Sequence, residues 1–394
     1  MFKNNRNLFI ISLIVVVNAL GYGIIIPILY AYSLKFGLND FQNGLLFAVF
    51  SICQFLSTPI IGRMSDKFGR RPLLIVSLSG TAVSFIMMAF APNVLFLFLA
   101  RALDGITAGN IPVAQAVISD TTEGKERARA FGIIFASFSF GLIFGPVISG
   151  FTYGISQALP FLIAGVITII AVLLTVIYLP ETNKHMGEVR QGRLFDFGKL
   201  WHTLFDQNVG LTFIITLIYN FAFACAIIYG YQPFVIKVLG LSAVQNALLF
   251  TLFGVVGFLS QALFVHRFST YFGVKKAFTL SLAAAVVAFL IMFFSRSLPI
   301  FIVAAIIMGF FNGMTQTLIT TILSQETDAK SQGTILGLNA SYMSIGQIFG
   351  PIIGGAIAAF FIPLPLLLGA VCAFICLLLS FHILKPGVKK ETVF

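Results

Sequence analysis

The chain has 394 residues, of which 59% are hydrophobic and only 9% are charged, and its mean hydropathy is +1.02. A water-soluble protein of this length cannot bury so much apolar surface, so the composition excludes an ordinary soluble fold and makes the lipid bilayer the solvent. The formal net charge of +11 would suggest nucleic acid as a partner of a soluble protein, but the positions of the charges explain it better.

Twelve apolar runs are each long enough for a membrane-spanning helix, which needs about 20 residues. They predict an all-α integral membrane protein, and their even number places both termini on one side of the membrane. The runs cover residues 8–34, 43–62, 72–91, 94–118, 128–152, 158–179, 209–236, 243–264, 276–294, 298–323, 332–361 and 363–384.

The basic residues set the orientation. With the N-terminus in the cytoplasm, twenty of the 24 Lys and Arg residues fall in cytoplasmic segments, three in outer loops and one, Arg101, within a span. This excess satisfies the positive-inside rule. We therefore expect a multi-pass protein of the inner cell membrane with both termini cytoplasmic, and no nucleic-acid partner.

The chain contains an internal repeat of two similar segments. Residues 118–150 align with residues 323–355 without a gap, at an offset of 205, which joins span 5 to span 11. We expect two six-helix bundles, residues 1–180 and 209–394, joined by a cytoplasmic linker at 181–208. Two parallel halves with a site between them are typical of transporters.

The repeat carries a candidate hinge motif built from glycine and proline. Glycine lets two helix backbones approach closely, and Gly-Pro bends a helix by removing a backbone hydrogen bond. Ordinary tight packing is the alternative explanation. The motif residues are Gly141, Gly145, Pro146, Gly346, Gly350 and Pro351.

The linker contains a run of apolar residues at helical spacing. An interfacial helix lying on the inner leaflet is the preferred interpretation, and a flexible linker is the alternative. The residues are Leu194, Phe197, Leu200, Trp201, Leu204 and Phe205.

Arg101 and Asp104 are the only charged residues deep in a predicted span, and they lie one helical turn apart. A buried charge costs roughly 2.5–3.5 kcal/mol at the centre of a membrane helix, so the pair needs a reason. Either the two charges neutralise each other permanently, or Asp104 leaves Arg101 during part of a cycle and binds a proton. The sequence leaves both hypotheses open.

Uncharged polar residues recur at helical spacing in several spans. Together with the many Phe residues they predict a substrate cavity for a bulky, amphipathic small molecule, although hydrogen bonds between helices are the alternative role for each one. The candidates are Asn18, Tyr22, Gln115, Asn220, Gln232, Gln261, Asn312, Gln316, Asn339 and Tyr342.

The loop between spans 2 and 3 reads "GRMSDKFGRRPLL", and a degenerate echo, "HRFSTYFGVKK", lies between spans 8 and 9. Together with "RALDGITAG", "GLIFGPVISG" and "LPETNK", the loop resembles the signature motifs of the major facilitator superfamily. Within that superfamily the chain is most similar to the twelve-span drug/proton antiporters, above all the tetracycline/proton antiporters. The resemblance implies the major facilitator fold.

The chain departs from those antiporters at three acidic positions. They carry membrane acids in helices 1, 3 and 9, whereas this chain has Asn18 and Ser84 at the first two positions and no acid in 276–294. The departures leave Asp104 as the one deep acid that a proton could use.

The signature loop predicts a cytoplasmic gate. Asp66 can pair with Arg70 or cap the following helix, and the resemblance implies that Asp120 approaches Arg70. A basic turn that only sets membrane topology is the alternative. The candidate gate residues are Gly62, Asp66, Gly69, Arg70, Arg71 and Asp120.

These features predict a secondary-active exporter of drugs or other amphipathic small molecules, working by alternating access and coupled to protons. A metabolite or siderophore exporter, or a proton-coupled uptake symporter, is the alternative. We expect no enzyme, cofactor or metal site, because the four histidines map to the inner side and no phosphate-binding loop is present. We expect a monomer.

Overall fold

The computed structural model describes residues 2–122, 124–183, 186, 197–206, 209–327 and 331–384. Every regular element within these ranges is a helix, which confirms the all-α prediction. The α-helices are α1 (Phe2–Leu34), α2 (Asp40–Phe68), α3 (Arg70–Ala89), α4 (Val94–Thr107), α5 (Asn110–Thr121), α6 (Gly124–Tyr153), α7 (Leu159–Tyr178), α8 (Phe197–Thr203), α9 (Gly210–Phe223), α10 (Tyr231–Pro233), α11 (Ala243–Leu259), α12 (Val265–Phe272), α13 (Val274–Phe294), α14 (Leu298–Gln325), α15 (Gln332–Ala358) and α16 (Leu364–Ile383).

Eleven helical stretches in the described ranges are long and apolar enough to cross a membrane. The α15 helix is not among them, because its glycines and its Ser, Asn and Gln residues lower its hydropathy. It is nevertheless 27 residues long, and a helix rising about 1.5 Å per residue needs only about 20 residues to span the hydrocarbon core.

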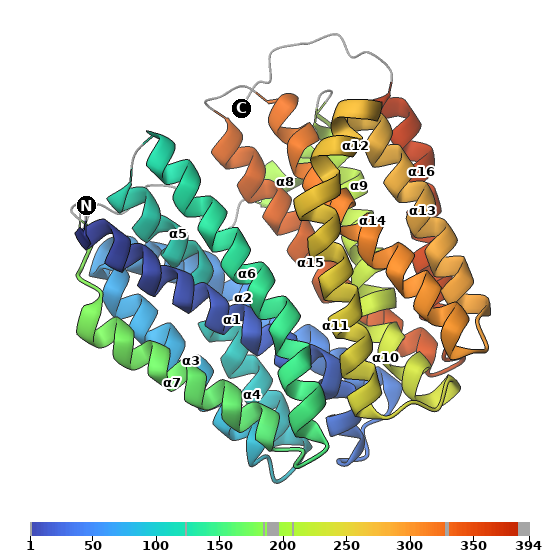
Figure 1. Cartoon of the computed structure of the whole chain (residues 1–394), viewed down its shortest axis with the longest axis horizontal. Helices are drawn as coiled ribbons and strands as arrows, with labels where there is room; N and C mark the ends of the chain where they lie inside the picture. Colours follow the sequence, from blue (N-terminus) through green and yellow to red (C-terminus); the bar gives the residue numbers. More distant parts are fainter. Residues whose placement is uncertain are drawn as a thin grey trace. The chain divides into compact units, whose positions relative to one another are not determined.

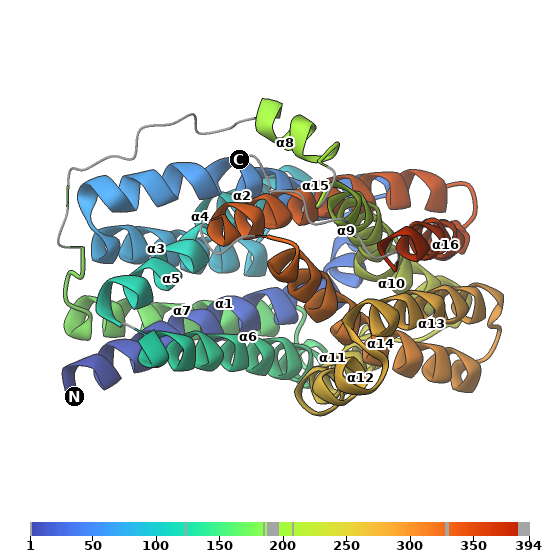
Figure 2. The same cartoon turned by 90° about the horizontal axis from the view of Figure 1, so that it is seen from above.

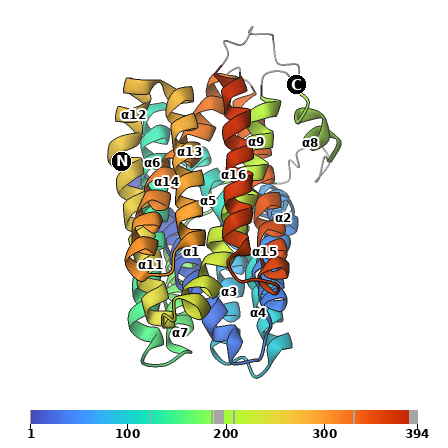
Figure 3. The same cartoon turned by 90° about the vertical axis from the view of Figure 1, so that its right-hand side faces the viewer.

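Contacts divide the chain into two compact units. The described residues of the first unit fall within Met1–Leu38, Val49–Phe195 and Ser242–Thr251, and those of the second within Asn39–Ala48, Asp196–Leu241 and Leu252–Phe394. In the first unit α1 packs along α6, and α3 packs along α7 (Figure 1, Figure 2). In the second unit α13 packs against α14 and α16 (Figure 3).

The predicted hinge glycines bring helix backbones together inside each unit. A Cβ on Gly145 of α6 would lie 2.6 Å from the carbonyl carbon of Gly23 in α1. A Cβ on Gly350 of α15 would lie 2.8 Å from the amide nitrogen of Cys225. Gly141 and Gly346 make equally close approaches one turn earlier. Both α6 and α15 continue through the prolines that follow.

A second repeated stretch starts a helix in each half. Residues 38–47 read "LNDFQNGLLF" and residues 241–250 read "LSAVQNALLF". In the first, Asn39 and Gln42 exchange hydrogen bonds between side chain and backbone of 2.8 and 3.0 Å. In the second, Ser242 and Gln245 do the same at 3.3 and 2.9 Å. These are capping boxes, which satisfy free N–H groups at a helix start.

The fourth apolar run is not one helix. It is divided into α4 and α5 by Ala108 and Gly109. Pro112 explains the break, since it has no N–H to donate to the carbonyl of Ala108 and its ring crowds that carbonyl. The sequence-based prediction of a single helix over 94–118 missed this effect.

The seventh and eighth runs contain π-helical segments that the sequence analysis did not predict: η1 (Ala224–Gly230) and η2 (Phe234–Val238) in the seventh, and η3 (Ser260–Phe264) in the eighth. Pro233 lies between the first two and cannot donate the usual backbone hydrogen bond. Such widened turns are rare and occur often at functional sites.

The linker prediction falls partly outside the described residues, among them Leu194. The described part contains the short helix α8, with Trp201 exposed and its ring 5.4 Å from that of Phe205. The hydroxyl of Tyr342 in α15 donates a hydrogen bond to the carbonyl of Leu200 at 2.5 Å, which ties α8 to the second unit. The predicted domain boundaries and the interfacial position of this segment stay predictions.

The close approach of α1 and α6 predicts a stability effect. Gly145→Ala would push a methyl group into the backbone of α1, so we expect it to lower the free energy of unfolding by about 1–3 kcal/mol, as overpacking does. Thermal unfolding of the purified protein in detergent measures this change. Gly132→Ala is the matched control, because no atom lies within 4 Å of a Cβ there. Equal unfolding midpoints for the two variants would contradict the packing described.

Candidate functional site

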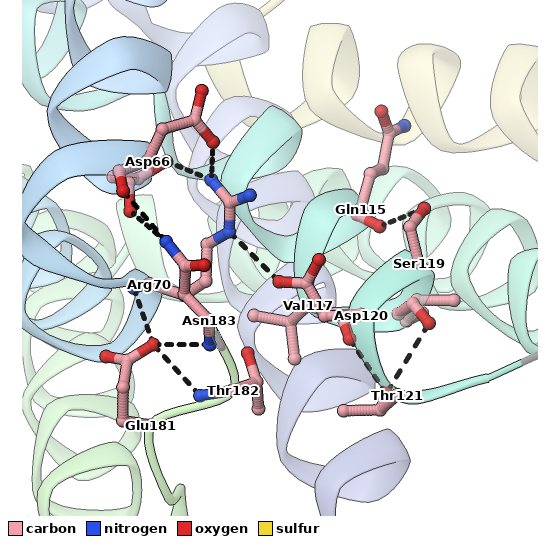
Figure 4. Close-up of polar contacts among 12 residues, drawn as sticks. Asp66, Arg70, Gln115, Val117, Ser119, Asp120, Thr121, Glu181, Thr182 and Asn183 are labelled. Carbon is pink, nitrogen blue, oxygen red and sulfur yellow. Dashed lines mark hydrogen bonds and ion pairs between the residues drawn. The ribbon is translucent and has the colours of Figure 1, made fainter. Parts of the chain in front are cut away.

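The loop between α2 and α3 holds a cluster of ion pairs in the first unit. Arg70 lies at the start of α3, and its guanidinium contacts the carboxylate of Asp66 at 2.6 Å and that of Asp120 in α5 at 3.1 Å (Figure 4). The hydroxyl of Ser65 accepts a further hydrogen bond from Arg70 at 2.7 Å. One arginine therefore joins the ends of α2, α3 and α5.

Glu181 is a member of this cluster that the sequence analysis did not identify. It follows α7, within "LPETNK", and its carboxylate accepts a hydrogen bond from the backbone N–H group of Arg70 at 2.9 Å (Figure 4). It also accepts one from the backbone N–H group of Arg71 at 3.1 Å. An anion at the N-terminus of α3 satisfies free N–H groups and complements the helix dipole. Two signals in the sequence pointed to it: an acid after the end of a long apolar helix, and the "LPETNK" motif that contains it.

Gly69 makes this arrangement possible. Its φ of 102° lies in the region that favours glycine, and a Cβ there would collide with the carboxylate of Glu181. Gly273, at the corresponding place between α12 and α13, also has a positive φ of 79°. The degenerate echo in the second half therefore keeps the turn of the signature loop.

The other two candidate gate residues, Arg71 and Gly62, take no part in the ion pairs of Arg70. Arg71 donates a hydrogen bond to the carbonyl of Val176 in α7 at 2.6 Å. Gly62 has open space around the position of a Cβ. The structure thus brings Asp66, Gly69, Arg70 and Asp120 together and places the other two beside them.

Arg101 and Asp104 form an ion pair of 3.0 Å inside the first unit. They are 2% and 5% exposed, and they are the only charged side chains that are buried among the described residues. The guanidinium of Arg101 lies 4.5 Å from the ring centre of Phe50. Tyr22 and Cys53 also interact electrostatically with Arg101.

Ser84 of α3 faces the acid of this pair. Its hydroxyl donates a hydrogen bond to the carbonyl of Thr81 at 2.7 Å, and the side chain also interacts with the carboxylate of Asp104. The position at which the tetracycline/proton antiporters carry an acid in helix 3 therefore lies beside the one buried acid among the described residues.

The other candidate cavity residues of the first unit do not join the pair. Asn18 donates its amide hydrogen to the carbonyl of Ile14 on its own helix at 3.0 Å. Gln115 is half-buried in α5, and its backbone carbonyl accepts a hydrogen bond from the Ser119 hydroxyl at 3.1 Å (Figure 4). Of the three candidates in this unit, Tyr22 is the one next to the buried charges.

Most candidate cavity residues of the second unit lie in pairs between helices. Gln316 donates to Asn220 at 3.3 Å, and Tyr219 donates to Asn312 at 3.1 Å. Thr216 donates to Asn339 at 3.2 Å, and Gln261 donates to Thr317 at 3.0 Å. These hydrogen bonds link α9 to α14 and α15, and η3 to α14. Tyr219 and Thr216 are partners that the sequence analysis did not single out.

Gln232 and Tyr342 lie apart from these pairs. The amide group of Gln232 donates to the carbonyl of Ile228 at 3.0 Å, while its buried Oε1 atom has no hydrogen-bond partner. Tyr342 directs its hydroxyl to Leu200, as described above, and its ring lies against Phe213. Within the described residues, no group of three or more His, Cys, Asp or Glu side chains is placed to hold a metal ion.

Comparison with known proteins gives a consistent result along the whole chain. The family model of the Major Facilitator Superfamily matches residues 11–270 and 259–393. The class C tetracycline resistance protein of Escherichia coli is 32% identical over 371 residues, which cover 91% of each chain. Multidrug resistance protein 1 of Bacillus subtilis (strain 168) is 31% identical over 360 residues, which cover 90% of each.

A solved structure supports the fold. The crystal structure of the nucleoside transporter NupG superimposes with a TM-score of 0.79, at 13% sequence identity, and the match covers 97% of this chain and 100% of that one. At this identity the likeness concerns the fold alone.

The Glu181 cap predicts a second stability effect. Glu181→Ala removes the acceptor of the two N–H groups at the start of α3, so we expect it to lower the free energy of unfolding by about 1–3 kcal/mol. Glu181→Gln retains one carbonyl oxygen, and its effect should be smaller. Thermal unfolding in detergent measures both, with Glu126→Ala, a change at an exposed acid, as the control. An unchanged midpoint for Glu181→Ala would rule out a stabilising cap.

Proposed function

Because the chain belongs to the Major Facilitator Superfamily, we propose that it is a secondary-active exporter that carries drugs or other amphipathic small molecules out of the cell in exchange for protons. The observation that carries this proposal is similarity over about nine tenths of the chain to proteins named for tetracycline and multidrug resistance. We further propose that the protein is a monomer of the inner membrane and that both its termini are cytoplasmic.

The second unit supports an amphipathic substrate. The paired amides and hydroxyls of Tyr219, Asn220, Asn312 and Gln316 are uncharged, and the rings of Phe223 and Phe253 lie 6.1 Å apart in the same unit. A ligand can replace one partner in each of these hydrogen bonds at little cost in free energy, because the amide and hydroxyl groups that form them are uncharged. Aromatic rings provide the apolar surface that such a ligand needs.

The buried pair of the first unit supports proton coupling. Asp104 is the one buried acid among the described residues, and Arg101 holds it in an apolar environment. We favour the hypothesis in which Asp104 alternates between pairing with Arg101 and binding a proton. One charge moving down 100 mV supplies about 2.3 kcal/mol. At about 1.4 kcal/mol for each tenfold ratio, this supports roughly a 50-fold substrate gradient.

The cluster around Arg70 supports a cytoplasmic gate. Asp66, Asp120 and Glu181 bring three helices and the segment after α7 to one arginine through bonds that a helix shift would break. An element of this kind has two discrete states, paired and unpaired, and substrate or proton binding can bias it.

The experiment that tests the function is uptake of fluorescent drugs into everted membrane vesicles that contain the protein. Export by the cell appears as accumulation inside such vesicles. We expect accumulation that collapses when an uncoupler is added. Accumulation that the uncoupler leaves intact would exclude proton coupling, and transport of no drug in the panel would favour the metabolite exporter.

Asp66→Asn tests the gate. The change keeps the shape of the side chain but removes one of the two carboxylates that contact the guanidinium of Arg70, and hydrogen bonds to charged groups contribute about 1.5–3 kcal/mol. We expect drug accumulation to fall roughly tenfold or more, while the amount of protein in the membrane stays the same. Lys67→Gln, in the same loop and exposed, should transport normally. Normal transport by Asp66→Asn would exclude a gating role for the cluster.

Asp104→Asn tests the proton carrier. Because asparagine cannot bind and release a proton, we expect proton-driven accumulation to be abolished, while exchange of labelled for unlabelled drug continues. Vesicle uptake with and without a pH gradient separates the two activities, and Glu126→Gln is the control. Wild-type coupling in Asp104→Asn would show that Asp104 is not the sole carrier.

A further inference from the structure

A row of buried polar side chains extends from Asp104 within the first unit. Ser84 and Thr81 belong to α3, Thr107 is the last residue of α4, and Asn110 is the first residue of α5. None of the four is more than 8% exposed. Ser84 stands where the tetracycline/proton antiporters carry an acid in helix 3, and the sequence alone suggested no role for the other three residues.

Hydrogen bonds connect Ser84, Thr81 and Thr107, and Asn110 follows Thr107 three residues later in the chain. The hydroxyl of Ser84 donates a hydrogen bond to the carbonyl of Thr81 at 2.7 Å, and the side chain also interacts with the carboxylate of Asp104. The hydroxyls of Thr81 and Thr107 lie 3.1 Å apart, across the contact of α3 with α4. Gly80 permits this approach, because a Cβ there would collide with the side chain of Thr107.

Asn110 ends the row at the break between α4 and α5. It is 0% exposed, and neither its amide nitrogen nor its amide oxygen has a hydrogen-bond partner. No side chain caps the start of α5, where the first backbone N–H groups have no partner within that helix. Burying unpartnered polar groups costs free energy, and in proteins such groups are usually satisfied by internal water.

Simple cohesion between helices does not account for this end of the row. Serine and threonine hydroxyls often bond to carbonyls of their own helix or to a neighbouring helix, and Thr81 with Thr107 fits that role. An unpartnered asparagine beside a helix break contributes no such bond. Pro112 maintains the break between α4 and α5, because it cannot donate a backbone hydrogen bond to the residue four positions earlier.

We propose that Ser84, Thr81, Thr107 and Asn110 line a water path that carries protons between Asp104 and the break in this span. The path rests on the proton antiport proposed above. When the carboxyl of Asp104 releases its proton, a bound water molecule accepts it as hydronium, and the carboxylate left behind pairs with Arg101. The proton passes from water to water along the hydroxyls, and Asn110 holds the last water by donating and accepting hydrogen bonds without changing its own protonation.

The position of Asn110 along α5 gives the direction of the path. From Asn110, α5 continues to Asp120, whose carboxylate contacts Arg70 in the candidate gate. The groups that interact electrostatically with Arg101 beside Asp104 are Tyr22 and Cys53, neither of which carries a permanent charge. The row therefore leads from the buried acid toward the cytoplasmic end of the unit.

The test compares proton-driven transport with exchange in everted vesicles, using Hoechst 33342 as the probe. Asn110→Leu, Thr81→Val and Thr107→Val remove polar groups while keeping similar side-chain size. We expect each to lower uptake driven by a pH gradient at least tenfold and to leave exchange of the dye without a gradient within twofold. Thr168→Val is the matched control, since Thr168 is equally buried in the same unit and bonds only to the carbonyl of Ala164 on its own helix.

Three outcomes would overturn the path. The first applies if the uncoupler abolishes uptake by the wild type. Gradient-driven uptake at wild-type rates in all three variants would then overturn the path. A parallel loss of exchange and gradient-driven uptake in variants with a wild-type unfolding midpoint would also overturn it, since that result indicates a structural role. Uptake by the wild type that ignores the uncoupler would overturn proton antiport itself, and the path with it.

Discussion

The cost of placing a charge in an apolar interior shapes this protein more than any other constraint. A membrane helix tolerates an ionised side chain only when a partner offsets its desolvation. Among the described residues of the first unit, Arg101 and Asp104 meet this condition, because they lie 3.0 Å apart with the ring of Phe50 beside the guanidinium. The remaining paired charges of that unit are collected at the ends of α2, α3 and α5, where backbone groups and partial exposure stabilise them.

Close packing of helices is the second constraint, and both copies of the internal repeat meet it with glycine residues. Gly145 and Gly350 occupy the same place in the repeat and each allows a neighbouring helix to approach backbone to backbone. Lipid provides no hydrophobic force between helices, so such contacts and interhelical hydrogen bonds hold the units together. The hydrogen bonds of Tyr219 with Asn312 and of Thr216 with Asn339 play that part in the second unit.

The elements that depart from regular helix are concentrated in three of the spans. The break before Asn110 and the π segments beside Pro233 free backbone groups that a continuous helix would satisfy. Buried polar side chains lie at both places, Asn110 at the break and Gln232 between the π segments. Helix distortions and buried polar side chains therefore occur at the same places in this chain.

The sequence by itself determined the membrane class, the apolar runs, the duplication and the pairing of Arg101 with Asp104, because these depend on composition and on spacing along one helix. It also placed Asp66 and Arg70 one turn apart. Only the tertiary structure decided that Glu181 caps α3, that Ser84 faces Asp104 and that Thr81 meets Thr107. These contacts join residues from different helices, and neither periodicity nor propensity along one helix reports which faces of two helices will meet.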